Sequence, residues 1–219
     1  EDVDATGLAW EVGDADKICR PVPGTLTRAS WLAQPTAQVL LSMYEADGQP
    51  AAADPRHVLA RAVERLAQHG LRAVLACEIE FYLLRERRDA DGTLRLEPAG
   101  GGRPGERGKI DSYSLTRLDD LAPLFDEVYA TAEAQGLPVE TLMSEYAPGQ
   151  FEVTLAHRDD ALRAVDEAVL WKRLLRGVAE HGGEGTAGDR PLLDAPVRLG
   201  HVDPAQLVEG GCQIRGVGE

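Results

Sequence analysis

Four glutamates occupy two stretches of the sequence that otherwise have the pattern of buried strands. In AVLACEIEFYLL (73–84), Glu78 and Glu80 alternate with apolar residues, and in SEYAPGQFEVTL (144–155), Glu145 and Glu152 flank a Pro-Gly turn. Successive side chains on a strand point to opposite faces, so residues two apart share a face at a spacing of about 7 Å. Neither stretch contains Lys or Arg, so no positive residue within them offsets the repulsion between these carboxylates.

Two interpretations fit this pattern. A half-exposed antiparallel sheet with a solvated polar face is common, and it would leave the glutamates without a function. Alternatively, four carboxylates on two strands form a site for a hard divalent cation, because Mg²⁺ and Mn²⁺ prefer oxygen ligands and their charge offsets the repulsion. Glutamate is depleted in strands and is rarely buried without a partner, and the presence of both stretches in one chain favours the metal site.

The composition of the chain limits its partners. A chain of 219 residues can hold one sizeable domain, or one domain with a small companion. The 37 acidic and 23 basic residues give a net charge of −14, which argues against nucleic acid and anionic membranes as partners. No apolar run approaches the ~20 residues of a membrane span, and no signal-peptide pattern opens the sequence.

The three cysteines predict a reducing, cytoplasmic setting. Cys19, Cys77 and Cys212 are odd in number and widely spaced, and they form neither a CxxC nor a zinc-type group. Cys77 falls on the apolar side of its stretch, and we interpret it as a small buried hydrophobe.

Helical and strand patterns alternate along the chain, which predicts an α/β or α+β layer. Residues 1 to about 50 are interrupted by Gly and Pro and predict a small strand-rich unit with a hairpin at EADG (45–48). Asp54 before Pro55 is a helix N-cap, and helical periodicity follows until Gly70. Beyond it, the sequence predicts strands over 72–84, 137–144 and 150–155 and helices over 114–136 and 159–182.

A charged, glycine-rich segment over residues 85–112 has no periodicity. It predicts either a mobile loop, such as a flap, or a simple excursion on the surface.

Several segments together resemble the glutamine synthetase family. They are ICRPVPGTL (18–26), ADPRHVLARAVERL (53–66), CEIEFYLL (77–84), SEYAPGQFEV (144–153) and DDALRAVDEAVLWKRLLRGVAEHGG (159–183), and they follow the family's order. The likeness is greatest to bacterial members that join glutamate to amines, the γ-glutamylpolyamine synthetase type. A lone ExE or PGQxE motif would be weak, but the ordered set covers residues 1 to about 182.

The resemblance implies an ATP-dependent ligase in which the glutamate γ-carboxylate is phosphorylated and ammonia or an amine then displaces phosphate. It implies an α+β fold with a partial β-grasp domain over residues 1–50, followed by the first part of a half-barrel α/β catalytic domain over residues 51–182. Family members assemble into homo-oligomeric rings in which the small domain of one subunit completes the neighbour's active site. Whether this chain forms such a ring stays open.

The resemblance also implies roles for single residues. Glu80, Glu145 and Glu152 fall where the family holds the cation nearer glutamate and ammonium, and Glu78 falls where it helps to hold the cation that orients the ATP phosphates. The two Mg²⁺ or Mn²⁺ ions polarise the γ-phosphoryl oxygens and neutralise charge as the phosphoryl group moves. Glu140 matches a position that the family uses near the nucleotide, and an exposed strand residue is an equal alternative.

The family pattern stops after Gly182. The segment of the type ATFMAKP, and the histidine, glutamate and arginines that hold metal, ATP and glutamate phosphate, have no counterpart in residues 183–219, where we expect a poorly ordered tail. A frameshift or a truncated gene would give this pattern, and a genuine alternative C-terminus stays open. The chain is then either a γ-glutamyl ligase or a catalytically inactive remnant that only binds metal or partner subunits. Without the missing elements, the helices over 54–69 and 159–181 are expected to expose apolar faces.

Overall fold

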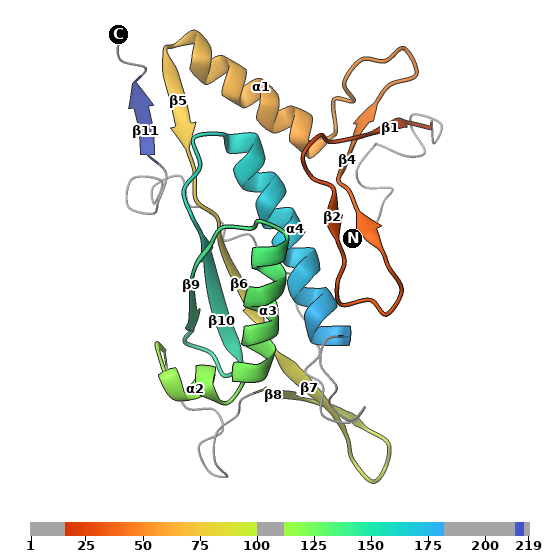
Figure 1. Ribbon diagram of the computed structural model, residues 1–219, viewed down its shortest axis with the longest axis vertical. Helices are drawn as coiled ribbons and strands as arrows, with labels where there is room; N and C mark the ends of the chain where they lie inside the picture. Colours follow the sequence, from red (N-terminus) through yellow and green to blue (C-terminus); the bar gives the residue numbers. More distant parts are fainter. Residues whose placement is uncertain (1–15, 100–111, 182–212, 217–219) are drawn as a thin grey trace.

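A three-stranded antiparallel sheet forms the centre of the computed structural model, which describes residues 16–99, 112–181 and 213–216. The strands lie in the order β6 (Glu78–Tyr82), β10 (Gln150–Leu155) and β9 (Val139–Ser144). Helices α3 (Ala122–Ala134) and α4 (Ala161–His181) lie across one face of this sheet (Figure 1). The mixed α/β layer predicted from the alternation of elements is confirmed.

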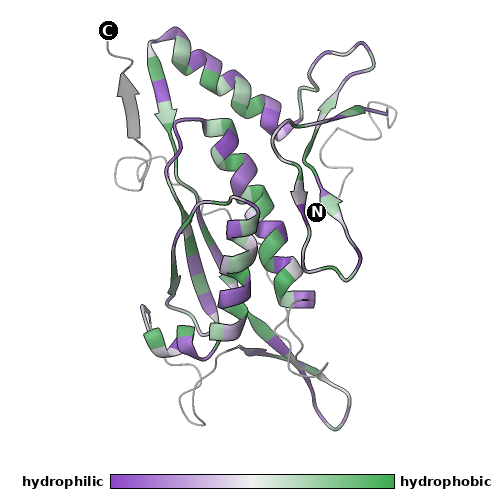
Figure 2. Ribbon diagram, viewed as in Figure 1, coloured by the Kyte–Doolittle hydropathy of each residue, from purple (hydrophilic) through white to green (hydrophobic). Residues whose placement is uncertain are grey.

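The core forms between the sheet and these helices because the strands alternate apolar and polar residues. Ile79, Phe81, Phe151 and Val153 are at most 1% exposed and belong to one apolar cluster with α3 and α4. The ring of Phe151 stacks on Phe81 at 5.9 Å and meets Phe125 of α3 edge-on at 5.2 Å. Figure 2 shows the alternation as green and purple bands along the sheet strands. The even-numbered residues of β6 and β10 therefore face away from the core.

Helix α4 supplies most of the helical side of the core. Trp171, Leu174 and Leu175 are fully buried, and the first turn is capped by Asp160, whose carboxylate accepts a hydrogen bond from the Arg163 N–H at 3.1 Å. The expectation that this helix exposes an apolar face is wrong, because the sheet and α3 cover it. No helix in the described ranges combines the length and the apolarity that crossing a membrane requires.

Helix α1 (Pro55–Gln68) begins where the sequence predicts, with Asp54 as its N-cap. Its apolar face is much less covered, since His57 is its one buried residue and Val58 is 49% exposed. The expected exposure is therefore confirmed for α1.

The predicted strand over 72–84 is divided into β5 (Leu71–Val74) and β6, with residues 75–77 between them. β5 pairs with β11 (Gln213–Gly216) rather than with the central sheet. β11 lies in the segment where the sequence predicts a poorly ordered tail. The rest of residues 183–219 lies outside the described ranges.

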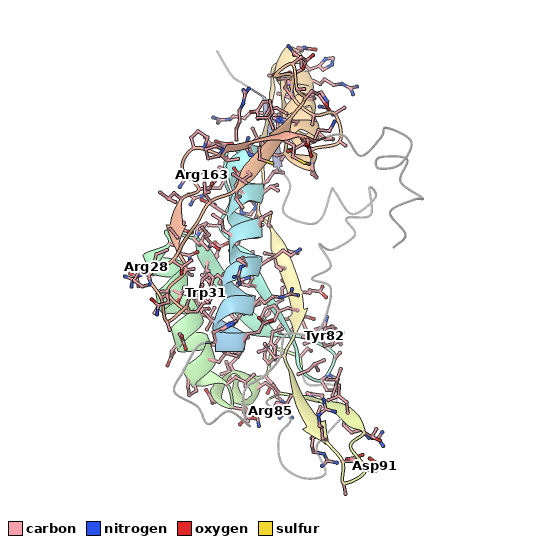
Figure 3. All side chains as sticks on the ribbon, turned by 90° about the vertical axis from the view of Figure 1, so that its right-hand side faces the viewer. Arg28, Trp31, Tyr82, Arg85, Asp91 and Arg163 are labelled. Atoms are coloured by element: carbon pink, nitrogen blue, oxygen red, sulfur yellow. The ribbon has the colours of Figure 1, made fainter. Side chains whose placement is uncertain are left out.

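The N-terminal unit, residues 16–50, is strand-rich as predicted. β1 (Ile18–Pro21) pairs with β4 (Leu41–Tyr44), and β2 (Thr27–Arg28) pairs with β3 (Ala37–Gln38). Trp31 attaches this unit to α4, beside which it lies in Figure 3. A Cβ added at Gly177 would overlap the Cε2 and Nε1 atoms of the Trp31 ring, so the ring lies directly on the helix backbone.

The segment predicted as an irregular loop over 85–112 contains a hairpin instead. β7 (Leu84–Arg88) and β8 (Leu94–Pro98) pair antiparallel and project from the body of the molecule (Figure 1). Strand alternation was hidden because the hairpin does not pack one face into the core, so charged residues follow one another along it. Residues 100–111 lie outside the described ranges. The helix predicted over 114–136 is likewise two helices, α2 (Leu115–Asp119) and α3.

Candidate metal centre

The strand register places three of the four predicted metal ligands on the sheet face opposite the core. Glu80 is paired with Glu152 in the β6–β10 ladder, and Glu78 is paired with Thr154. The ladder hydrogen bonds fall on the odd-numbered residues of both strands, so Glu80 and Glu152 form a non-hydrogen-bonded pair. In such pairs the Cα atoms are about 4.5 Å apart and the side chains are closest.

Glu145 reaches the same face from the end of β9. Its N–H donates to the Gln150 carbonyl at 2.9 Å, which continues the β9–β10 register one step beyond Ser144. Alternation then directs Glu145 to the side of Met143, which is paired with Glu152. We call the surface made by Glu78, Glu80, Glu145 and Glu152 the acid face.

Glu152 occupies the middle of the acid face and interacts with the other three carboxylates. Burial raises the pKa of Glu152 most, and the charges of Glu78, Glu145 and Glu80 raise it further, to about 7 from an ordinary 4.5. A hydrogen bond with the Thr154 side chain acts in the opposite direction. A half-buried carboxylate among three others is unfavourable in its charged form, and a divalent cation would remove that penalty.

A tight turn holds the acid face in place. The Gln150 side chain donates to a Glu80 carboxylate oxygen at 2.7 Å and accepts from the Ala147 N–H at 3.0 Å. Gly149 has φ +76°, and a Cβ there would come within 2.8 Å of the Leu83 carbonyl oxygen. The turn therefore requires glycine at this position. Because Gln150 belongs to β10, its hydrogen bond fixes the Glu80 carboxylate relative to that strand.

The acid face is open rather than closed around an ion. Among the described residues, no group of three or more His, Cys, Asp or Glu side chains is arranged to hold a metal ion. Glu78 and Glu80 are exposed, so their carboxylates can separate in solvent to lower the repulsion. Glutamate has three side-chain torsions, which allow the carboxylates to turn inward around a cation. The structure places these ligands on one face, and their convergence on one ion stays a prediction.

Glu140 is not part of this group. The register shifts between Thr154 and Leu155, which pair with Thr141 and Val139, so Glu140 is the extra residue of a β-bulge. It is exposed and lies five residues from Glu145, about 16 Å along the strand. Its charge is not among those that raise the pKa of Glu152. Its predicted place near the nucleotide is a separate role and stays a prediction.

The sequence analysis missed one residue on the acid face and one whose backbone is bonded next to it. The first is Gln150, which the alternation with Glu152 could have identified. The second is Tyr113, the one non-glycine residue with positive φ in the described ranges, at 58°. It is 67% exposed, and its N–H donates to the Ser144 carbonyl at 2.8 Å, next to Glu145. Strained backbone of this kind collects at functional sites, but no sequence pattern marks it.

A family comparison agrees with the mixed α/β fold. The family model for the glutamine synthetase catalytic domain matches residues 52–202. The match begins at the boundary predicted near residue 50. It continues past Gly182, so the likeness extends further than the motifs in the sequence indicated.

Individual relatives support the same family assignment. The chain is 39% identical to γ-glutamylputrescine synthetase of Escherichia coli over 81% of its length and 38% of that protein. It is 30% identical to the glutamine synthetase of Pyrococcus abyssi over 91% of its length and 42% of that protein. A crystal structure of a glutamine synthase homologue superposes with a TM-score of 0.58 at 27% identity, covering 77% of this chain and 36% of that one. The chain thus spans about two fifths of the length of the curated relatives it matches. The matched range and the identity to these relatives show that the chain belongs to the glutamine synthetase catalytic domain family.

Proposed function

We propose that this chain carries the metal-binding strands of an ATP-dependent ligase that joins the γ-carboxylate of glutamate to an amine or to ammonia through a γ-glutamyl phosphate. One observation carries the proposal: Glu152 lies opposite Glu80 and among Glu78 and Glu145, with its pKa raised to about 7 by burial and by their charges. A solvated polar face with no function would not need a half-buried carboxylate at its centre.

The residues fit Mg²⁺ or Mn²⁺. Four carboxylates supply only oxygen donors, and among the described residues neither cysteine nor histidine lies on the acid face to favour a softer metal. In this proposal Glu80, Glu145 and Glu152 hold one ion, and Glu78 contributes to a second. When bound, the metals supply charge neutralisation for the phosphoryl group as it moves from ATP to glutamate.

The remaining residues orient and limit the site. Gln150 holds the Glu80 carboxylate through its 2.7 Å hydrogen bond and leaves the second carboxylate oxygen for an ion. Tyr113 is exposed and its N–H bonds the Ser144 carbonyl, one residue before Glu145, so its side chain is proposed to border the surface that a substrate would contact. Glu140 is proposed to serve the nucleotide from the bulge of β9.

The acceptor is proposed to be an amine rather than ammonia. The support is the higher identity to the putrescine-using relative, 39%, compared with 30% for the glutamine synthetase. We further propose that residues 1–50 belong to a partial β-grasp domain, that residues 51–182 form the first part of the catalytic domain, and that in a ring the small domain of one subunit borders the neighbour's site. A cytoplasmic location is part of the same proposal.

Phosphate release measured with ATP, glutamate, Mn²⁺ and a panel of putrescine, spermidine, ethanolamine or ammonia tests the proposal. We expect release that depends on the acceptor and is at least tenfold slower in Glu152→Gln, with Glu140→Asp as a comparison at the nucleotide position. Soluble, correctly folded protein that binds Mn²⁺ but releases no phosphate with any acceptor would contradict the ligase proposal. That result would instead support the remnant that binds only metal or partner subunits.

A further inference from the structure

Two side chains of β10 hold carboxylates of the acid face by hydrogen bonds. The Gln150 amide donates to Oε2 of Glu80 at 2.7 Å, from β10 to β6. The Thr154 hydroxyl bonds the carboxylate of Glu152 and favours its charged form, so the hydroxyl is the donor. Gln150, Glu152 and Thr154 alternate along one strand, so both donors lie on the same face as the carboxylates that they hold.

Each of these donors engages one oxygen of its carboxylate. A hydroxyl carries a single hydrogen, and the Gln150 amide reaches Oε2 of Glu80 while its own oxygen is fixed by the Ala147 N–H at 3.0 Å. Glu145 has the same arrangement, because its Oε2 accepts from the Tyr146 N–H at 3.3 Å. Each of the three carboxylates proposed to share an ion therefore turns one oxygen to the chain and has one oxygen to offer to the ion.

This division of the carboxylate oxygens decides which ions suit the acid face. Mg²⁺ and Mn²⁺ have about six positions in a near-octahedral arrangement, and they can be held by single carboxylate oxygens. Ca²⁺ is larger, takes roughly six to eight oxygens, and often takes both oxygens of one carboxylate. Three single oxygens therefore suit an octahedral ion and leave about three of its positions for water or substrate. Ca²⁺ is denied the two-oxygen contacts that raise its coordination number.

We propose that Gln150 and Thr154 are positioning residues that limit Glu80 and Glu152 to one oxygen each, and that they thereby make the acid face select Mg²⁺ or Mn²⁺ over Ca²⁺. The inference rests on the proposed metal centre and adds the residues that decide its ion. Each residue acts through the carboxylate that it holds. Hydrogen bonds that only relieved the repulsion between carboxylates would stabilise the protein without changing the choice of ion, so the choice of ion is the property to measure.

Calorimetric titration of the full chain with Mn²⁺ and, separately, with Ca²⁺ tests the proposal. Thr154→Val removes the hydroxyl at nearly constant size, so Glu152 can offer both of its oxygens. Mn²⁺ should bind about tenfold more weakly, as the loss of a donor to a metal ligand commonly causes, while Ca²⁺ should bind as tightly as before or more tightly. The ratio of the two dissociation constants should therefore shift toward Ca²⁺ by about tenfold or more. Gln150→Met should shift the ratio in the same direction through Glu80.

Two further variants separate this role from a general effect on the sheet. Thr154→Ser keeps the hydroxyl and should keep the wild-type ratio of dissociation constants. Thr141→Val is the matched control, because Thr141 is the partner of Thr154 in the β9–β10 ladder and is not among the groups that act on Glu152. Its ratio should also stay that of the wild type, and circular dichroism checks the folding of every variant.

The outcomes distinguish this inference from the metal centre on which it rests. Mn²⁺ and Ca²⁺ binding that weaken by the same factor in Thr154→Val and Gln150→Met would overturn the selection of the ion and leave the metal centre in place. A shift in Thr141→Val as large as in Thr154→Val would do the same. Wild-type protein that binds no Mn²⁺ would overturn the metal centre and this inference together.

Discussion

The ring of Trp31 occupies the space that a Cβ at Gly177 would fill, so the N-terminal unit rests on the bare backbone of α4. Glycine inside a helix costs about 1 kcal/mol relative to alanine, and this contact compensates for that cost. We expect Gly177→Ala to destabilise the protein by about 1–3 kcal/mol through overpacking, measured by chemical denaturation. In a Trp31→Ala background the sign should reverse, because alanine then gains its helix propensity without a clash. A destabilisation of equal size in both backgrounds would show that the contact is not responsible.

The acid face should bind Mn²⁺ in solution. Replacing Glu80 or Glu152 with Gln removes an anionic oxygen ligand while keeping the size of the side chain, so titration calorimetry should show at least tenfold weaker binding. Glu140→Gln is the control, because Glu140 lies on the bulge of β9 and its charge does not act on Glu152. Equal loss of affinity in all three variants would point to a general effect of charge instead of a defined site.

The raised pKa of Glu152 gives a specific dependence of stability on pH. A carboxylic acid whose pKa is raised in the folded state has no effect on stability at a pH where it is protonated in both the folded and the unfolded protein. As the pH rises from about 4.5 to about 7, the unfolded protein loses this proton first, so the free energy of unfolding falls. In metal-free buffer, Glu152→Gln should therefore be neutral at pH 4 and stabilising at pH 8. The gain should be on the order of 1 kcal/mol, because solvent screens a half-exposed group. Saturating Mn²⁺ should reverse this difference, since it stabilises only the wild-type carboxylate.

Asp54 should show the opposite dependence on pH. Burial acts to raise the pKa of Asp54, but hydrogen bonds from the N–H groups of Met43, His57 and Arg56 outweigh it, and the pKa is lowered. Its contribution to stability is therefore present above the unfolded pKa of about 3.8 and is lost as the pH falls through the lower folded value. Asp54→Ala should cost about 1–2 kcal/mol at pH 7, and the difference from wild type should shrink on acidification. A constant difference over the same range would rule out this account.

Sequence reasoning located the parts of the fold that local chemistry decides. The Asp54–Pro55 cap marked the start of α1, and alternation assigned Glu78, Glu80 and Glu152 to one face of their strands. The pairing of Glu152 with Glu80 instead of Glu78 was not predictable, because register depends on a partner about 70 residues away in the chain and on where the turn at Gly149 closes.

Other features gave no local signal. The hairpin does not pack one face into the core, so the alternation that reveals strands is hidden in it, and β11 pairs with β5 only through contacts far apart in the sequence. The positive φ of Tyr113, whose N–H donates to the Ser144 carbonyl, leaves no pattern in the residue types. These elements depend on tertiary contacts rather than on propensity.

The alternation along β10 has a consequence for the way this chain can vary. A single residue inserted directly after Gln150 would turn Glu152 into the apolar layer and expose Phe151 and Val153, whereas two residues would restore both sides. The tip of the hairpin at residues 89–93 carries no such constraint, and additions there change only a surface turn. Related genes should therefore differ in length freely at that tip and keep the spacing of β10 fixed.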